Sequence, residues 1–177
     1  MLFRLCLYLA AVLVVCFSGN ANADSRIADF FGSYTGFGFA TDSSGPFIRT
    51  ERNFELAIGP LEGGGFEIAW STVKRKGSNP NSLVSEVSEH AEQFRPSDKP
   101  GVFFGVNNGT VFDSSPIQWA RLQSDVLIVY RMEVDENGVI ELHVYQRMLT
   151  AKGLELFFRA TRDNIEVRSV RGRYRRQ

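Results

Sequence analysis

The side chains in this chain that are best suited to hold a ligand are polar or amphipathic residues set among apolar ones. Alternation along the predicted strands places them on the same face as Ile, Leu, Val, Met and Phe side chains. They are Tyr34, Trp70, Trp119, Arg121, Tyr130 and Gln146. An apolar concavity with a few fixed polar groups is the usual form of a small-molecule site. We therefore expect an apolar or amphipathic ligand, oriented by Arg121, Tyr130 or Gln146. The alternative is a filled core with Arg121 at its rim.

The histidines and the nucleophilic residues give little indication of catalysis. His143 is predicted on the outer face with Glu141, Tyr145 and Arg147. His90 lies among glutamates in SEVSEHAE, and a metal site or a single-histidine haem site there is an alternative, although a structural zinc site normally needs four ligands. The chain has no G-x-S-x-G elbow, and its cysteines are confined to the N-terminal segment. A triad assembled in space is not excluded by sequence. We expect no enzyme activity, no cofactor and no metal.

Strands must position these residues, because apolar side chains recur with period two and show no sustained helical period. Residues 83–95 fit either a helix or a polar strand, and their neighbours favour the strand. The predicted strands are Phe30–Ala40, Phe54–Ile58, Phe66–Val73, residues 83–95, Gly101–Val106, Ile117–Leu122, Val126–Val134, Val139–Leu149, Leu154–Ala160 and Ile165–Val170.

Three turns set the register of the last four strands. They are three-residue loops at Glu136–Gly138 and Ala151–Gly153 and a two-residue loop at Arg162–Asp163. The predicted partners are Tyr130 with Val144, Met132 with Leu142, Val134 with Ile140, Met148 with Leu156, Gln146 with Phe158, Ala160 with Ile165, and Phe158 with Val167. This register keeps the apolar side chains on one face, which we expect to be the interior.

The stretch FFGSYTGFGFA alternates aromatic residues with glycines. Glycine lets a barrel strand bend and lets neighbouring backbones approach closely. The stretch lacks the third glycine, the preceding strand and the following helix of a dinucleotide-binding loop. Eight to ten strands with short connections predict an all-β fold, an antiparallel up-and-down meander closed into a barrel.

At Gly32-Ser33-Tyr34 the chain resembles the lipocalin and wider calycin barrels, in which a glycine-x-tryptophan motif opens the first strand. In those barrels a basic residue late in the last strand packs across the aromatic ring. The resemblance implies that Tyr34 replaces the tryptophan and that Arg171 is the packing cation. The second family signature, a threonine-aspartate-tyrosine triplet, is matched only in part, by Ser124-Asp125. The resemblance implies a lipocalin-like barrel that binds a small, mostly apolar molecule inside.

Residues 1–23 have the pattern of a cleaved signal peptide. A basic residue precedes the apolar run Leu5–Phe17, and a small-x-small site ends at Ala23. The run is shorter than the ~20 residues of a membrane-spanning helix. Lipid attachment at Cys16 and an uncleaved anchor are the alternatives. We therefore expect residues 24–177 to form a single periplasmic or secreted domain without cysteine.

The charges of the chain nearly balance. Its 20 basic and 20 acidic residues become 19 and 20 when Arg4 leaves with the signal, a net charge of −1. This argues against a nucleic-acid partner. The C-terminal RSVRGRYRRQ is locally basic. It is either a solvated strand end or a contact for a membrane surface with anionic headgroups.

Two other interpretations stay open. A barrel with a packed interior would act through its outer surface as a cell-envelope interaction or assembly protein, with Phe37, Tyr145 and Phe157 as contact residues. An outer-membrane barrel is disfavoured by the charges predicted on the outer face, among them Glu133 and Glu141. The oligomeric state is left open.

Overall fold

The computed structural model describes residues 26–42, 49–75, 84–110 and 115–177. The predicted signal peptide, residues 1–23, lies outside the described residues. The described elements are η1 (Ile27–Phe30), β1 (Gly32–Asp42), β2 (Arg49–Leu61), η2 (Glu62–Gly64), β3 (Gly65–Arg75), β4 (Val84–Pro96), β5 (Val102–Gly105), β6 (Ile117–Gln123), β7 (Val126–Val134), β8 (Ile140–Thr150), β9 (Gly153–Arg162) and β10 (Ile165–Arg176). Neither of the described 3₁₀ helices is long and apolar enough to cross a membrane.

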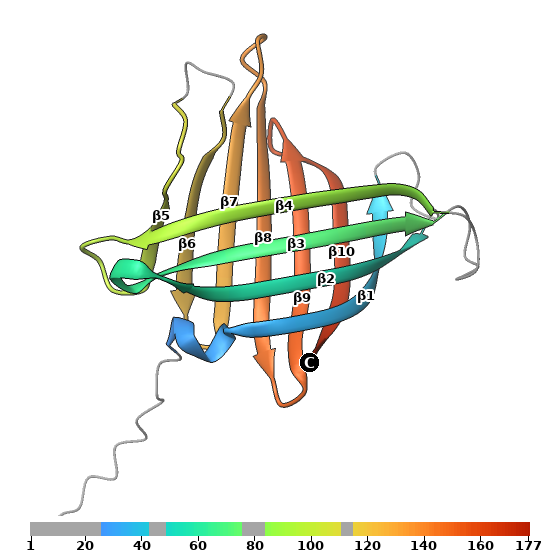
Figure 1. The fold of residues 1–177 in the computed structure, drawn as a ribbon. Helices are drawn as coiled ribbons and strands as arrows, with labels where there is room; N and C mark the ends of the chain where they lie inside the picture. Colours follow the sequence, from blue (N-terminus) through green and yellow to red (C-terminus); the bar gives the residue numbers. More distant parts are fainter. Residues whose placement is uncertain (1–25, 43–48, 76–83, 111–114) are drawn as a thin grey trace, which may run out of the picture.

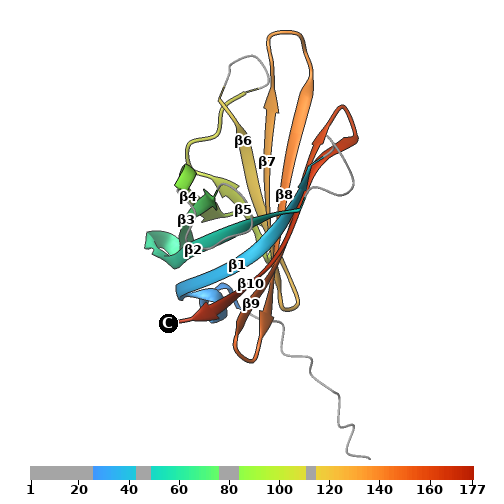
Figure 2. The same cartoon turned by 90° about the vertical axis from the view of Figure 1, so that its right-hand side faces the viewer.

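The strands form a closed antiparallel barrel in which each pairs with its neighbours along the chain and β1 pairs with β10. In Figure 1, β2, β3 and β4 run across β6–β9 at a steep angle, and Figure 2 shows these two layers from the side. The predicted all-β meander barrel is confirmed. Residues 84–95 belong to β4, so the strand interpretation of that segment is right. The architecture is compatible with a lipocalin-like barrel.

An aromatic plug closes one end of the barrel. Phe30 of η1 is fully buried, and its carbonyl accepts a 2.7 Å hydrogen bond from the Tyr34 hydroxyl. The cation over the Tyr34 ring is Arg176, at 5.4 Å, and the prediction of Arg171 is wrong. The register explains this, because Tyr34 pairs with Arg176, whereas Arg171 lies outside the barrel with its guanidinium 5.6 Å from the Phe157 ring.

The glycines of β1 make room for a ring inside the barrel. Gly38 pairs with Gly172 of β10. A Cβ atom at Gly38 would lie 2.8 Å from the Phe54 ring, and one at Gly172 would lie 2.7 Å from it. Real Cβ atoms do not approach other atoms so closely. At Gly38 the backbone carbonyl oxygen of Arg171 would be closer still, at 2.4 Å, so this position requires glycine because of the facing β10 backbone as well as the Phe54 ring.

The register predicted for the β7–β8 hairpin is confirmed, and that for β8–β9 is wrong by one residue. Tyr130 pairs with Val144, Met132 with Leu142 and Val134 with Ile140, as expected. Met148 pairs with Glu155 instead of Leu156, and Gln146 with Phe157 instead of Phe158. The loop holds two residues, because Gly153 is the first residue of β9 and its φ of 147° suits close packing on the β10 backbone.

The β9–β10 turn also differs from the expectation. Asp163 and Asn164 both have positive φ, 47° and 66°, as a two-residue hairpin turn requires. Arg162 therefore pairs with Ile165, and further along the ladder Ala160 pairs with Arg168 instead of Ile165, and Phe158 with Val170 instead of Val167. The ladder is irregular between Glu166 and Arg168, so a bulge shifts the remaining pairs.

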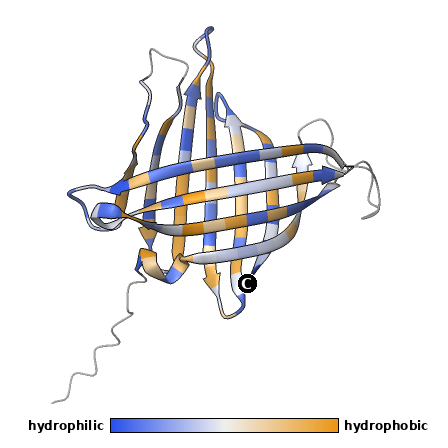
Figure 3. Ribbon diagram, in the orientation of Figure 1, coloured by the Kyte–Doolittle hydropathy of each residue, from blue (hydrophilic) through white to orange (hydrophobic). Residues whose placement is uncertain are grey.

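The face of β7 and β8 that points inward is opposite to the one predicted. Tyr145 packs on Trp70 of the opposite layer, with ring centroids 5.2 Å apart, so alternate residues of β8 such as His143 and Arg147 face the interior. Their neighbours Leu142 and Val144 face outward. Figure 3 shows hydrophilic and hydrophobic residues alternating along both strands. The prediction was wrong because it assumed that the more apolar face must be the inner one.

Candidate functional site

The barrel interior is filled at one end and hollow further along. Phe66 stacks on Phe94 at 4.9 Å and meets Phe103 edge-on at 5.1 Å, and this cluster fills the interior beside β5. A cavity of about 370 Å³ lies further along. It is lined by Arg52, Phe54, Trp70, Thr72, Lys74, Glu86, Ser88, His90, Arg131, Glu133, His143, Tyr145, Arg147, Leu156, Phe158, Arg168, Val170 and Tyr174. Its volume lies within the ~300–1,000 Å³ of small-molecule sites.

Arg147 is the outstanding polar group of the cavity. β8 directs it inward, and only 1% of its surface is exposed. Its Nε and Nη1 atoms are buried and have no hydrogen-bond partner among the described residues. Burial lowers the pKa of this guanidinium, and the nearby Tyr174 and Tyr145 hydroxyls oppose the change. A buried cation with unsatisfied donors is costly unless something anionic or polar meets it.

Aromatic rings surround this guanidinium. Its central carbon lies 5.4 Å from the Trp70 ring and 5.2 Å from the Tyr145 ring, within the range of a cation–π interaction. His90 stacks on Trp70 at 5.1 Å, and Phe158 packs on Tyr145 at 4.7 Å. Burial raises the pKa of Tyr145 to about 12, so its hydroxyl remains protonated at neutral pH. The rings form an apolar wall around one cationic centre.

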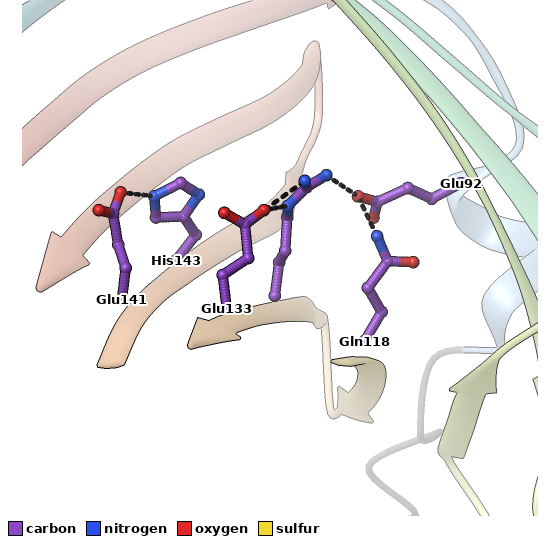
Figure 4. Close-up of polar contacts among 6 residues, drawn as sticks. Glu92, Gln118, Glu133, Glu141 and His143 are labelled. Atoms are coloured by element: carbon purple, nitrogen blue, oxygen red, sulfur yellow. Dashed lines mark hydrogen bonds and ion pairs between the residues drawn. The ribbon is translucent and has the colours of Figure 1, made fainter. Parts of the chain in front are cut away.

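A buried hydrogen-bond network joins the two layers beside the cavity (Figure 4). Oε1 of Glu92 on β4 accepts a 2.7 Å bond from Gln118 Nε2 and a 3.4 Å bond from Arg131 Nη1. Arg131 also donates to Glu133, with Nε to Oε1 at 2.8 Å. Burial raises the pKa of Glu92, and the positive charge of Arg131 opposes this rise. The network fixes the Arg131 side chain at the cavity wall.

A second polar group lies near the β7–β8 hairpin. Nε2 of His143 is 2.7 Å from Oε1 of Glu141, whose Oε2 accepts a 2.8 Å bond from Arg162. The hydrogen bond from Arg162 lowers the pKa of Glu141, and the hydrogen bond with His143 adds to this effect. His90, across the cavity, has a pKa lowered by burial and by the charges of Arg131 and His143.

Cations outnumber carboxylates around the cavity. Its lining contains the cationic side chains of Arg52, Lys74, Arg131, Arg147 and Arg168. Its carboxylates are Glu86 and Glu133. Glu86 lies 3.6 Å from the Lys74 ammonium, and Glu133 bonds to Arg131. The lining therefore has a net positive charge, which favours an anionic guest.

The sequence-predicted site residues do not come together. Trp70 lines the cavity, and Tyr34 is buried at the plugged end against Phe30. The inward orientation predicted for the other four is wrong, because they alternate with buried residues and lie on the outer face of β6, β7 and β8. They are Trp119, Arg121, Tyr130 and Gln146. Trp119 and Tyr130 stack on each other outside the barrel at 4.8 Å.

The residues that do form the cavity were mostly missed. His143, Tyr145 and Arg147 were placed outside, and Arg131 was given no role. The sequence VIELHVYQRML did contain a usable signal. Its alternation places apolar side chains on one face of the strand and mostly polar ones on the other, and either face can point into the barrel. Choosing between the faces requires knowing which residues the opposite layer presents.

Another concavity, of about 600 Å³, lies outside the barrel on β1–β4. Its lining includes Ala57, Ala69 and Ala91, which are partners across β2, β3 and β4. Within the described segments, no group of three or more His, Cys, Asp or Glu side chains is placed to hold a metal ion. The interior cavity, with its buried cation and aromatic wall, is the better candidate site.

Comparisons of the chain with protein-family models, with curated proteins and with solved structures found no match. The fold and the cavity by themselves define the class of protein. It is a closed, ten-stranded antiparallel barrel whose interior is partly hollow, aromatic and positively charged.

Proposed function

We propose that this barrel binds a small amphipathic molecule with an anionic group. The observation behind the proposal is Arg147, which is buried at the cavity with two guanidinium nitrogens that have no hydrogen-bond partner in the described part of the chain. A carboxylate, sulfonate or phosphate beside it would accept those hydrogen bonds and offset the cost of burying the charge. The rings of Trp70, Tyr145 and Phe158 would cover the apolar body of the ligand. The protein acts as a binder in this proposal, and the ligand leaves chemically unchanged.

Export is part of the proposal. Residues 1–23 have the sequence pattern of a signal peptide, and cleavage after Ala23 would release the barrel into the periplasm or the medium. The measured mass of the protein recovered from those fractions tests this. A chain that still contains residues 1–23 would contradict it.

The first experiment is native mass spectrometry of the purified protein, compared with its denatured mass. A bound species that is lost on denaturation identifies the ligand class directly. An anionic aromatic probe, 1-anilinonaphthalene-8-sulfonate, then provides a titration. The chain has two tryptophans, so Trp119→Phe leaves Trp70 as the reporter of the cavity. We expect the probe to change Trp70 fluorescence in this variant.

The deciding variant is Arg147→Met in the Trp119→Phe background. We expect it to weaken binding of the sulfonate probe at least about ten-fold, since a charged hydrogen bond is worth ~1.5–3 kcal/mol. The matched control is Arg121→Met, which removes an arginine from the exposed outer face of β6. Equal binding by Arg147→Met and the parent, or equal losses in both variants, would contradict the proposal.

A further inference from the structure

The outer surface of the barrel is apolar on one side. On β6, β7 and β8, the outward positions include the apolar or aromatic Ile117, Trp119, Val126, Ile128, Tyr130, Met132, Val134, Ile140, Leu142 and Met148, the buried Val144, and the polar Arg121, Gln123, Gln146 and Thr150. The surface continues onto β9 and β1, where Phe157, Phe39 and Phe37 are 38%, 39% and 54% exposed. Three exposed phenylalanines beside such a band are unusual for a surface that only meets water.

Arginines lie between these rings. Arg171 of β10 pairs with Phe39 on one side and Phe157 on the other, and its guanidinium lies 5.6 Å from the Phe157 ring. Arg173 pairs with Phe37 and lies 3.5 Å from Glu155. The basic aromatic patch is the set Phe37, Phe39, Phe157, Arg159, Arg171 and Arg173.

The other side of the barrel has the opposite charge. β2, β3 and β4 form the near layer in Figure 1. Their outward positions whose exposure is described include Glu51, Glu55, Glu67 and Glu89, and the basic Arg95. The molecule therefore has an acidic side and a basic aromatic side. Such a division favours contact between the basic aromatic side and an extended, anionic partner that has an apolar region into which the phenylalanine rings can insert.

We propose that the basic aromatic patch docks the barrel on an anionic phospholipid bilayer. The three phenylalanines enter the headgroup region, and the arginines bond to lipid phosphates. Each basic residue near an anionic bilayer contributes ~1 kcal/mol to binding, or about five-fold in affinity. Charge argues for lipid rather than a second copy of the chain, because a symmetric contact would bring Arg171 and Arg173 of two copies together. The inference is independent of the ligand proposed for the cavity.

Vesicle sedimentation tests the proposal with the purified protein at physiological salt. We expect binding to vesicles of equal parts phosphatidylcholine and phosphatidylglycerol, little binding to phosphatidylcholine alone, and release by added salt. Arg171→Gln with Arg173→Gln should lower the affinity about 25-fold, as two residues at about five-fold each. Phe37→Ser with Phe157→Ser should also abolish sedimentation.

Matched controls use equally exposed residues on the acidic side. Val87 on β4 is 54% exposed, as Phe37 is, so Val87→Ser tests the loss of exposed apolar surface elsewhere. Arg95→Gln tests the loss of an exposed arginine. Both should bind vesicles as the parent does, and near-ultraviolet circular dichroism confirms that all variants are folded.

Three results would overturn the proposal. The first is equal binding to both kinds of vesicle, or to neither. The second is wild-type affinity in the arginine pair variant. The third is a dimer, detected by light scattering, that the phenylalanine pair variant converts to monomer, because a second copy would then cover the patch.

Discussion

The guanidinium of Arg176 lies over the ring of Tyr34, 5.4 Å from its centroid, and Nη2 donates a 2.8 Å hydrogen bond to the Tyr34 hydroxyl. The same nitrogen donates a 2.6 Å bond to the carbonyl of Asp29 in η1. The Tyr34 hydroxyl also donates to the Phe30 carbonyl, so the Tyr34 and Arg176 side chains together connect β10, β1 and η1.

We expect Tyr34→Phe to lower the free energy of unfolding by about 1–3 kcal/mol, because it leaves the buried Phe30 carbonyl without its donor. Urea denaturation measures the change. The control is Tyr130→Phe, which lies on the outer face and should cost less than about 0.5 kcal/mol. Equal losses in the two variants would mean that the Tyr34 hydroxyl does not hold the plug.

Gly38→Ala should destabilise the protein by about 1–3 kcal/mol, because the new methyl group would meet the Phe54 ring and the facing backbone of β10. Gly59→Ala is the matched control within β2. Its Cβ would meet only the Glu67 side chain, at 3.6 Å, an ordinary contact. That variant should be neutral or slightly more stable. A loss of stability at Gly59 as large as that at Gly38 would show that strand flexibility, and not the Phe54 ring, decides the cost.

Removing the buried charge of Arg147 should increase the stability of the ligand-free protein while it weakens ligand binding. We expect Arg147→Met to raise the free energy of unfolding of the ligand-free protein by about 1–3 kcal/mol, since a well-packed apolar residue replaces an incompletely paired cation. Arg147→Lys, which keeps a buried cation, should give no such gain. Thermal unfolding of the two variants without ligand checks this. A large loss of stability in Arg147→Met would show that the guanidinium is satisfied inside the protein and needs no ligand.

Glu92 should make the protein less stable as the pH rises. Burial raises its pKa above the ordinary value of 4.5, so the folded state keeps the proton at a pH where the unfolded state has lost it. The contribution to stability is full below pH 4.5 and is lost as the pH rises through the raised pKa. In Glu92→Gln this loss disappears, so the stability of the variant relative to the parent should increase from pH 4.5 to pH 7.

The control for this titration is Glu89→Gln, which changes an exposed carboxylate on the same strand. Its stability relative to the parent should vary little over the same range. If urea denaturation shows that the difference in free energy of unfolding between Glu92→Gln and the parent does not change with pH, then Arg131 compensates the buried charge fully.

Local patterns in the sequence predicted the strands but could not orient all of them. Alternation located the elements, and the Glu136–Gly138 turn gave the right partners for Tyr130 and Val144. Gly153 was ambiguous, because a glycine after Ala-Lys fits the end of a three-residue loop or the start of a strand. A shift of one residue exchanges the two faces of every strand that follows.

The rule that the more apolar face of a strand points inward failed on β7 and β8, because the interior beside them is polar. Arg131 is acceptable inside because Glu92 bonds to it from a strand 39 positions away in the sequence, and Arg147 lies against Trp70 of β3. Glu133 and Tyr145, which also contact these arginines, lie only two positions away. The contacts across the barrel, to Glu92 and Trp70, are distant in sequence, so local patterns could not show that charged residues belong inside. The same charges leave apolar side chains outside, where the usual rule would place polar ones.

The pairing of β1 with β10 also affects how the chain can fold. The bond between Tyr34 and Arg176 spans 142 positions, so the ring of strands cannot close before nearly the whole chain is available. Contacts this distant slow folding, because the entropy of closing a long loop must be lost before the contacts form. Until the last strand arrives, β1 and β9 each have an open edge to which another chain could add. A nascent chain of this protein is therefore most prone to aggregate just before its last strand is available.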